Sequence, residues 1–507
     1  MAGVVGWFGE QRRIYCDNAA MVREFRTQLR GNKAPLSLTA YLGILVFMAV
    51  IVYWGISFGG DRSVTSMQGS LTNFYYVVVG MLEFLVAIIA PVVASSSIIG
   101  EYERKSIDLV FSSPMGAKYF LVGKLISSYR YVLMLIVLAM PIAALAVVLG
   151  GATWADVVSA LWTVSMHGLL YMAVSLPIAV MTAKSISAVL LSYVANFVWV
   201  NLAFGFGAPS LSSGTFSSPL IGLAPYLTGV SSNVQVDFFG LHMPMWVSTT
   251  LFAFLFVKLF VVGAGSALTQ GGSKETVSLR VHGLLYTLAF GLILGFASSS
   301  GATIPFGVTG PDWVATLWVA SGFLLVCLPA LSTWSLGGGS KNRPNGIFNA
   351  RQVLRGSPAS GLPYFSALLI VLAGSIGFSK FSLDAPMLVY LWAVFAAWGL
   401  AWSLGWLSSA FTFRQGPEAS KRLLLLLLFV VGVLPGIFLG IVEMTCKQAG
   451  MNLPDGWSEN FYLFSFISDD VGEASIKASV MTILALVLAF WAEKRRRQIV
   501  EDMRSLA

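Results

Sequence analysis

The sequence predicts an all-α integral membrane protein with about twelve transmembrane helices and both termini in the cytoplasm. Of the 507 residues, 57% are hydrophobic and 11% are charged, whereas soluble domains carry about 25% charged residues. The mean hydropathy is +0.79. Long apolar runs recur along the whole chain, and Lys and Arg concentrate in every second gap between them.

The apolar runs give the expected spans. A transmembrane helix needs about 20 predominantly apolar residues, and the third run is long enough to tilt or to project beyond the bilayer. The expected spans are 38–59, 73–98, 119–149, 155–182, 185–207, 245–268, 281–299, 313–333, 362–379, 385–411, 423–444 and 474–492.

The basic residues orient these spans. With the N-terminus inside, 25 of the 31 Lys and Arg residues fall in inner segments, four in outer segments and two within spans. This asymmetry follows the positive-inside rule, so the net charge of +8 indicates membrane topology rather than nucleic-acid binding. The first 37 residues carry charges throughout, which argues against a signal peptide.

An amphipathic pattern precedes the first span. In 19–37, Met21, Val22, Phe25 and Leu29 fall near helical spacing on one face, with arginines elsewhere around the helix. This pattern predicts an interfacial helix that lies flat on the membrane. A solvated basic tail is the alternative interpretation.

The first inner loop carries a second amphipathic pattern. The charged turn 101–105 reads Glu-Tyr-Glu-Arg-Lys, and the run 106–110 that follows is mostly apolar. Pro114 ends this run, because the residue before a proline disfavours helical backbone angles. The segment 99–115 therefore predicts a short helix on the membrane surface, with an ordinary charged loop as the alternative.

The outer segment 208–244 is neither an ordinary loop nor a span. It contains no Lys or Arg, yet Pro and Gly interrupt it too often for a transmembrane helix. Non-helical backbone at membrane depth is tolerated only where protein buries it or where it lines a cavity. We therefore expect a re-entrant or capping helical pair.

Residues 19–270 together resemble the membrane-spanning permeases of ABC-2-type transporters. The order is that of the family: connecting helix, two spans, coupling helix, three spans, outer re-entrant element and sixth span. The charged turn, the Ser-led run, Pro114 and the Gly123-Lys124 that enters the third span match the coupling segment. The resemblance implies that a separate ABC ATPase subunit docks on 19–33 and 99–115. The implied coupling residues are Arg23, Arg26, Glu101, Glu103, Arg104, Ser106, Leu109 and Pro114.

The later half departs from this plan. We expect an N-terminal cytoplasmic segment at 1–37, a six-span permease unit at 38–270 and six additional spans at 271–507. The stretch 348–356 echoes 25–31, but four spans rather than six follow it. An accessory helical domain and a decayed repeat both fit. We expect a homodimer of first-half units, with an internal pseudo-dimer as the alternative.

Two single charges lie within expected spans at similar depth. Glu83 is about ten residues from the outer end of the second span, and Lys258 is about thirteen from that of the sixth. At 1.5 Å per residue their depths differ by about 5 Å, and a charged side chain at the bilayer centre costs about 2.5–3.5 kcal/mol. The sequence therefore predicts a buried Glu83–Lys258 pair, either a substrate contact or a lock between helices.

The fifth span mixes aromatic and amide side chains, and amides at membrane depth need a partner or a wet cavity. In the family, the second and fifth spans line the central path. The substrate-path residues that the resemblance implies are Glu83, Tyr193, Asn196, Trp199, Asn201 and Lys258. Plain aromatic packing is the alternative. His167, the lone histidine of the fourth span, is expected to be a hydrogen-bonded helix contact.

Missing motifs narrow the chemistry. The sequence has no Gly-x-x-x-x-Gly-Lys-Ser/Thr loop, no His-Glu-x-x-His motif and no clustered His and Cys. We therefore expect no catalytic or metal site and no cofactor in this chain, with ATP and Mg²⁺ bound by the partner ATPase. The three cysteines are not expected to form a disulfide framework.

We expect the permease subunit of an ATP-driven exporter, multi-pass in the bacterial inner (plasma) membrane, in contact with lipid and without nucleic acid. The alternative is an ion-coupled secondary transporter with twelve spans, although its sites usually lie in both halves of the chain, and here the intramembrane charges lie in the first half only. A membrane-embedded enzyme would need clustered catalytic groups, which the sequence lacks.

Overall fold

The structure is a computed structural model. It describes 33–59, 64–105, 117–182, 185–205, 241–268, 274–299, 361–379, 385–412 and 471–505, with short stretches between 215 and 238 and a few residues at 423–430. These residues are almost entirely helical. The chain divides into two compact units, Met1–Thr269 and Gln270–Ala507.

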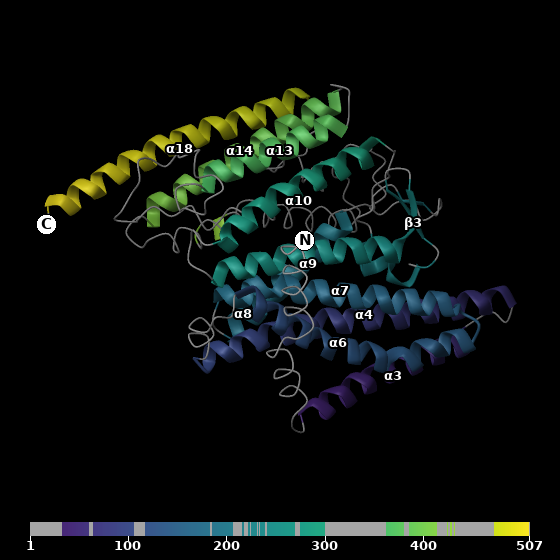
Figure 1. Ribbon diagram of the computed structural model, residues 1–507. Coiled ribbons are helices and arrows are strands. Elements are labelled where there is room, and N and C mark those ends of the chain that lie inside the picture. Colours follow the sequence, from purple (N-terminus) through teal and green to yellow (C-terminus); the bar gives the residue numbers. More distant parts are fainter. Residues whose placement is uncertain are drawn as a thin grey trace, which may run out of the picture. The chain divides into compact units, whose positions relative to one another are not determined.

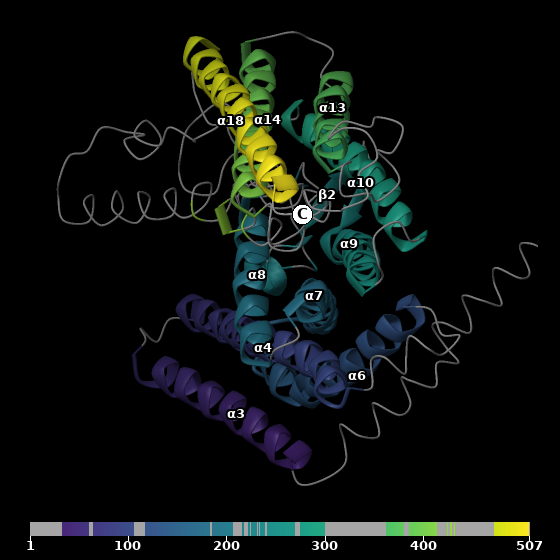
Figure 2. The same ribbon diagram turned by 90° about the vertical axis from the view of Figure 1, so that its left-hand side faces the viewer.

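The described helices of the first unit correspond to the first six expected spans (Figure 1). Among them, α7 is the central helix: it packs against α4, α6, α8 and α9, and 83% of its span is buried. The outlying helix is α3, which packs on α4 and α6 (Figure 2). The helices are α3 (Lys33–Gly59), α4 (Val64–Glu103), α6 (Ala117–Val148), α7 (Trp154–Thr182), α8 (Ser185–Gly205) and α9 (Met245–Leu268).

The second unit has four described helices, α10 (Lys274–Ser299), α13 (Gly361–Ser379), α14 (Ala385–Thr412) and α18 (Val471–Ser505). The helices pack in sequence order, with α10 against α13, α13 against α14, and α14 against α18. The expected span 313–333 lies outside the described residues, as does most of 423–444.

Several described helices are long and apolar enough to cross a membrane. By length and composition they number six, and shorter apolar segments lie at Ile186–Phe197 and Ser366–Ser375. Large hydrophobic side chains are exposed along these helices, for example Phe47 at 64% and Phe490 at 77%. Such surfaces need a lipid environment, so the chain is membrane-embedded. The six segments are Leu38–Gly55, Gln68–Glu103, Ala117–Val148, Trp154–Thr182, Met245–Leu268 and Ser475–Arg495.

The outer segment 208–244 differs from its expectation. Its described residues form a small sheet and a 3-10 helix instead of a helical pair. Strands β1 (Thr215–Phe216) and β2 (Gln235–Phe238) pair in parallel, and β2 pairs antiparallel with β3 (Leu241–Pro244). The 3-10 helix η2 (Pro225–Val230) packs on α4 and α7. We call the described residues of 215–244 the outer element.

Local sequence explains how α7 begins and how α4 ends. Thr153 and Asp156 form a capping box at the start of α7: the Thr153 amide donates to Asp156 Oδ2 at 2.8 Å, and the Asp156 amide donates to Thr153 Oγ1 at 3.3 Å. At the end of α4, Lys105 adopts a positive φ of 54°. A left-handed residue is the usual way in which a helix stops.

Candidate functional site

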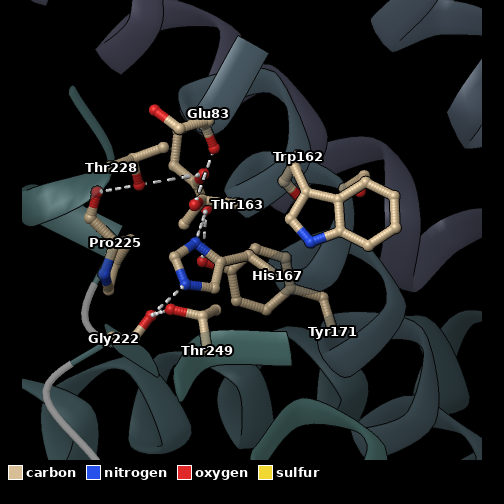
Figure 3. A network of polar contacts seen from close by, with 11 residues as sticks. Glu83, Trp162, Thr163, His167, Tyr171, Gly222, Pro225, Thr228 and Thr249 are labelled. Atoms are coloured by element: carbon tan, nitrogen blue, oxygen red, sulfur yellow. Dashed lines mark hydrogen bonds and ion pairs between the residues drawn. The ribbon is translucent and has the colours of Figure 1, made fainter. Parts of the chain in front are cut away.

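A buried polar cluster lies where α4, α7, α9 and the outer element meet (Figure 3). Glu83 of α4 is 5% exposed and His167 of α7 is 1% exposed. Tyr171 of α7 and Thr228 of η2 are buried beside them. We call these four residues the Glu83–His167 cluster.

The Glu83 carboxyl group is the centre of this cluster. Its Oε1 lies 3.1 Å from His167 Nδ1 and accepts a hydrogen bond from the Tyr171 hydroxyl at 2.9 Å. Its Oε2 lies 3.4 Å from the Thr228 hydroxyl, whose single hydrogen also faces the Pro225 carbonyl at 2.7 Å. A carboxyl group at membrane depth is thus satisfied by side chains from α7 and from the outer element, as a buried polar group requires.

The other side of the His167 ring holds the outer element. His167 Nε2 donates to the Gly222 carbonyl at 2.9 Å. The Thr249 hydroxyl of α9 lies 2.8 Å from the same oxygen and shares its hydrogen between it and the Met245 carbonyl at 2.9 Å. A Cβ atom on Gly222 would overlap the Thr249 hydroxyl. Glycine therefore permits the close approach that lets one carbonyl accept from two helices.

Hydrogen-bond roles fix the number of protons in this cluster. A carbonyl only accepts, so His167 Nε2 carries a hydrogen that it donates to Gly222. The contact between Nδ1 and Glu83 Oε1 then needs one further hydrogen, because two facing lone pairs would repel each other. That hydrogen belongs either to an imidazolium or to a carboxylic acid. In both forms the pair is neutral overall and shares one proton.

A second set of buried polar contacts joins α8 to α7 and α4. Asn196 is buried, and its amide donates to Ser175 Oγ at 2.9 Å and to the Ser192 carbonyl at 2.8 Å. The Ser192 and Ser95 hydroxyls lie 2.9 Å apart. The Ser175 hydroxyl donates to the Tyr171 carbonyl at 2.7 Å, so this set borders the Glu83–His167 cluster.

The other described residues of the expected substrate path each make contacts of their own, outside the Glu83–His167 cluster. The Tyr193 hydroxyl donates to the Ile88 carbonyl at 2.8 Å. Trp199 is buried and makes edge-on ring contacts with Phe256 and Phe260, at centroid distances of 4.9 and 5.7 Å. Trp199 therefore takes part in aromatic packing. The side chain of Asn201 lies outside the described residues.

The expected Glu83–Lys258 ion pair is wrong. Glu83 is buried against His167 and Tyr171, whereas the Lys258 side chain lies on an exposed face of α9. Similar depth does not make two side chains partners, because the depth of a residue does not determine in which direction its side chain points around the helix. His167, by contrast, is the hydrogen-bonded helix contact that the sequence predicts.

The inner end of α4 holds a second buried charge. Lys124 Nζ of α6 lies 2.8 Å from Glu101 Oε1, and both side chains are 3% exposed. The neighbouring Tyr102 hydroxyl donates to the Val180 carbonyl of α7 at 3.0 Å. Glu101, expected in an exposed docking turn, is thus a buried contact between α4 and α6.

The next residues of the expected coupling segment face outward. Glu103 and Arg104 are exposed at the end of α4. The remaining expected coupling residues, Arg23, Arg26, Ser106, Leu109 and Pro114, lie outside the described residues.

Sequence reasoning missed most partners of Glu83. A signal was present for two of them: Thr163, His167, Tyr171 and Ser175 recur at intervals of four residues and so mark one polar face of α7. Gly222 and Thr228 carried no comparable signal, because their placement depends on how the outer element folds.

In the part of the chain that the structure describes, no group of three or more His, Cys, Asp and Glu side chains is placed to hold a metal ion. No family model matches the chain, and no curated protein matches it.

Proposed function

We propose that the chain is the membrane-spanning subunit of an ATP-driven exporter of the ABC-2 type. It spans the bacterial inner membrane twelve times, keeps both termini in the cytoplasm and works with a separate ATPase subunit. The observation that carries this proposal is α4, a single helix that connects the inner charged turn to the buried cluster beneath the outer element.

The inner end of α4 is suited to receive force. The exposed residues Glu103, Arg104 and Lys105 lead directly into the segment proposed as the coupling helix. Immediately behind them, the buried Glu101–Lys124 pair and the Tyr102–Val180 hydrogen bond fix α4 to α6 and α7. A push on the charged turn would therefore move three helices together.

The middle of α4 is suited to deliver that force. Glu83 lies 18 residues before Glu101, which corresponds to about 27 Å along a helix. A shift of α4 there would change the Glu83–His167 and Glu83–Thr228 contacts, and Thr228 belongs to the outer element. Closure of an ATPase on the inner face would thereby release or clamp the outer element. Pro91 lies between the two points and removes one backbone hydrogen bond from α4.

The directions of packed helices support the proposed topology. Contacts along α4 and α7 run in the same direction, from Tyr75–Asp156 at one end to Tyr102–Val180 at the other. The Phe411–Trp491 contact follows a close approach of Gly399 to Met481, so α14 and α18 are also parallel. Parallel packing is what alternating spans require when one expected span separates the two helices. A six-span unit supplies half of a path, so we propose a homodimer.

The decisive experiment reverses the two exposed charges at the end of α4. The chain is purified together with a co-expressed ABC ATPase subunit, and ATP turnover is measured for the wild type and for Glu103→Lys/Arg104→Glu. We expect no ATP hydrolysis by the isolated chain and ATP hydrolysis by the wild-type complex. The double variant should still insert in the membrane, but it should lose most of the increase in ATP turnover that the wild-type chain gives to the ATPase.

The matched control is Glu493→Lys/Arg497→Glu on α18, which swaps a half-buried acidic residue and an exposed basic residue without changing the net charge. It should leave ATP turnover unchanged. Coupling that survives the reversal at 103 and 104, or robust ATP turnover by the chain alone, would refute the proposal.

A specific observation favours one second candidate, a proton-coupled secondary transporter. A buried carboxyl–imidazole pair that shares one proton is the kind of site that proton relays use within membranes. Proteoliposomes that contain the chain without any ATPase discriminate the two functions. Proton uptake driven by substrate under these conditions, abolished by Glu83→Gln, would replace the exporter proposal with this one.

A further inference from the structure

The inner end of α18 joins an apolar span to a basic sequence. The last two residues of the candidate span Ser475–Arg495 begin the basic run 494–497, which reads Lys-Arg-Arg-Arg. In the proposed topology this end lies at the cytoplasmic surface of the bilayer, where anionic headgroups attract basic side chains.

Aromatic rings hold one of these cations in place. The Arg495 guanidinium lies 5.0 Å from the centre of the Phe411 ring and 5.4 Å from that of the Trp491 ring. The two rings contact each other at 5.9 Å. Both rings are partly exposed, Phe411 at 53% and Trp491 at 37%. A guanidinium in cation–π contact is preorganised, and its N–H groups remain suited to bind phosphate oxygens.

An apolar stripe on α18 leads to this end. Ile483, Val487 and Phe490 are 61%, 59% and 77% exposed. The exposed Lys494 follows on the same face, since 483, 487, 490 and 494 repeat at helical spacing. The apolar stripe is thus followed by the ammonium group of Lys494 about one helical turn beyond Phe490.

We infer that Lys494 and Arg495 bind the phosphate of an anionic phospholipid whose acyl chains lie along Ile483, Val487 and Phe490. The charge and the apolar stripe match the two parts of such a lipid, whereas an acidic protein surface would match the cations alone. Arg497 is outside the site, because Glu493 lies 3.6 Å from it and offsets its charge. This inference rests on the topology of the proposed function but not on ATP-driven export.

The test counts lipids bound to the full-length chain. The protein is purified in detergent, titrated with dioleoyl-phosphatidylglycerol or with dioleoyl-phosphatidylcholine, and analysed by native mass spectrometry. The wild type should prefer the anionic lipid. Lys494→Gln/Arg495→Gln should weaken binding of phosphatidylglycerol by roughly 25-fold, at about fivefold for each neutralised charge, and should leave binding of phosphatidylcholine unchanged.

Two further variants keep the test decisive. Arg104→Gln/Lys105→Gln removes the same charge from another exposed inner helix end and should retain the preference. Arg495→Lys keeps the charge but loses the planar guanidinium, and should weaken binding by a few-fold without unfolding. The inference is overturned if 494/495 neutralisation leaves the preference intact, if the 104/105 control loses it equally, or if neutralisation instead breaks association with the ATPase or with a second copy.

Discussion

Two carboxyl groups on one helix are buried by different kinds of partner. Glu101, near the inner end of α4, lies 2.8 Å from the amine of Lys124. Glu83, 18 residues earlier, shares a proton with His167 and accepts from Tyr171. Both pairs are neutral overall, and each would stay neutral if its proton moved to the carboxyl group. That transfer is far less costly from a histidine than from a lysine, because the ordinary pKa of a glutamic acid, about 4.3, is much closer to that of a histidine, about 6.5, than to that of a lysine, about 10.4.

This difference determines what each pair can do. Removing one partner of the lysine pair takes away the charge that lies 2.8 Å from the other, so that pair is suited to a permanent attachment of α4 to α6. The histidine pair can redistribute its proton when a partner is removed or moved. It is therefore suited to a contact that opens and closes, such as the one we propose beneath the outer element.

The largest expected effect tests the permanent attachment. Glu101→Gln removes the carboxylate that lies 2.8 Å from the buried Lys124 ammonium and should destabilise the protein by about 3–5 kcal/mol. The midpoint of thermal unfolding in detergent, together with the yield of monodisperse protein, measures this loss. Glu103→Gln is the matched control: it removes a carboxylate from the same turn at an exposed position and should change stability by less than about 0.5 kcal/mol. Equal effects at the two positions would contradict the comparison.

The second prediction identifies the partner of Glu83 by double-mutant cycles. Glu83→Gln combined with His167→Leu should show a coupling free energy of about 2 kcal/mol, because the two side chains contact directly. Glu83→Gln combined with Lys258→Met should be additive within about 0.5 kcal/mol, since Lys258 is exposed on α9. Unfolding in mixed detergent micelles provides the free energies. Coupling to Lys258 and none to His167 would reject the cluster.

The smallest effect concerns the hydroxyl that supports Glu83. Tyr171→Phe removes a single hydrogen bond of 2.9 Å and should cost about 1 kcal/mol, because His167 still satisfies the same carboxyl oxygen. Tyr193→Phe, which removes a hydroxyl bonded to a backbone carbonyl on a partly exposed residue, is the comparison. The same unfolding assay serves both variants. A loss at Tyr171 as large as that at Glu101 would show that the cluster cannot redistribute its contacts.

The apolar runs determined where the described helices lie. Expected spans such as 155–182 and 245–268 correspond closely to α7 and α9, because a segment in lipid must satisfy its backbone hydrogen bonds internally and so becomes a helix. This constraint is local and does not depend on neighbouring helices. Polar side chains in such helices also need partners, and the Asn196 amide nitrogen and the His167 ring find theirs on other elements.

The outer element carries a local signal for strands. The apolar composition of 208–244, interrupted by Pro and Gly, predicts a helical pair, yet residues 233–238 read Asn-Val-Gln-Val-Asp-Phe, with polar and apolar residues in alternation. A period of two is typical of a half-buried strand. In the structure, Val236 of β2 is buried and its neighbour Gln235 is exposed. The alternation was readable, but the apolar composition concealed it.

The sequence by itself determined which stretches form the described apolar helices and how polar residues are spaced along each of them, because the rise per residue of a helix is fixed. Only the tertiary structure decided which polar residues meet. Glu83 and Lys258 have different surroundings, since the rotation of each helix about its axis follows from packing around α7. The Gly222 carbonyl enters the cluster for the same reason: the outer element must fold before α7 and α9 can both bond to it.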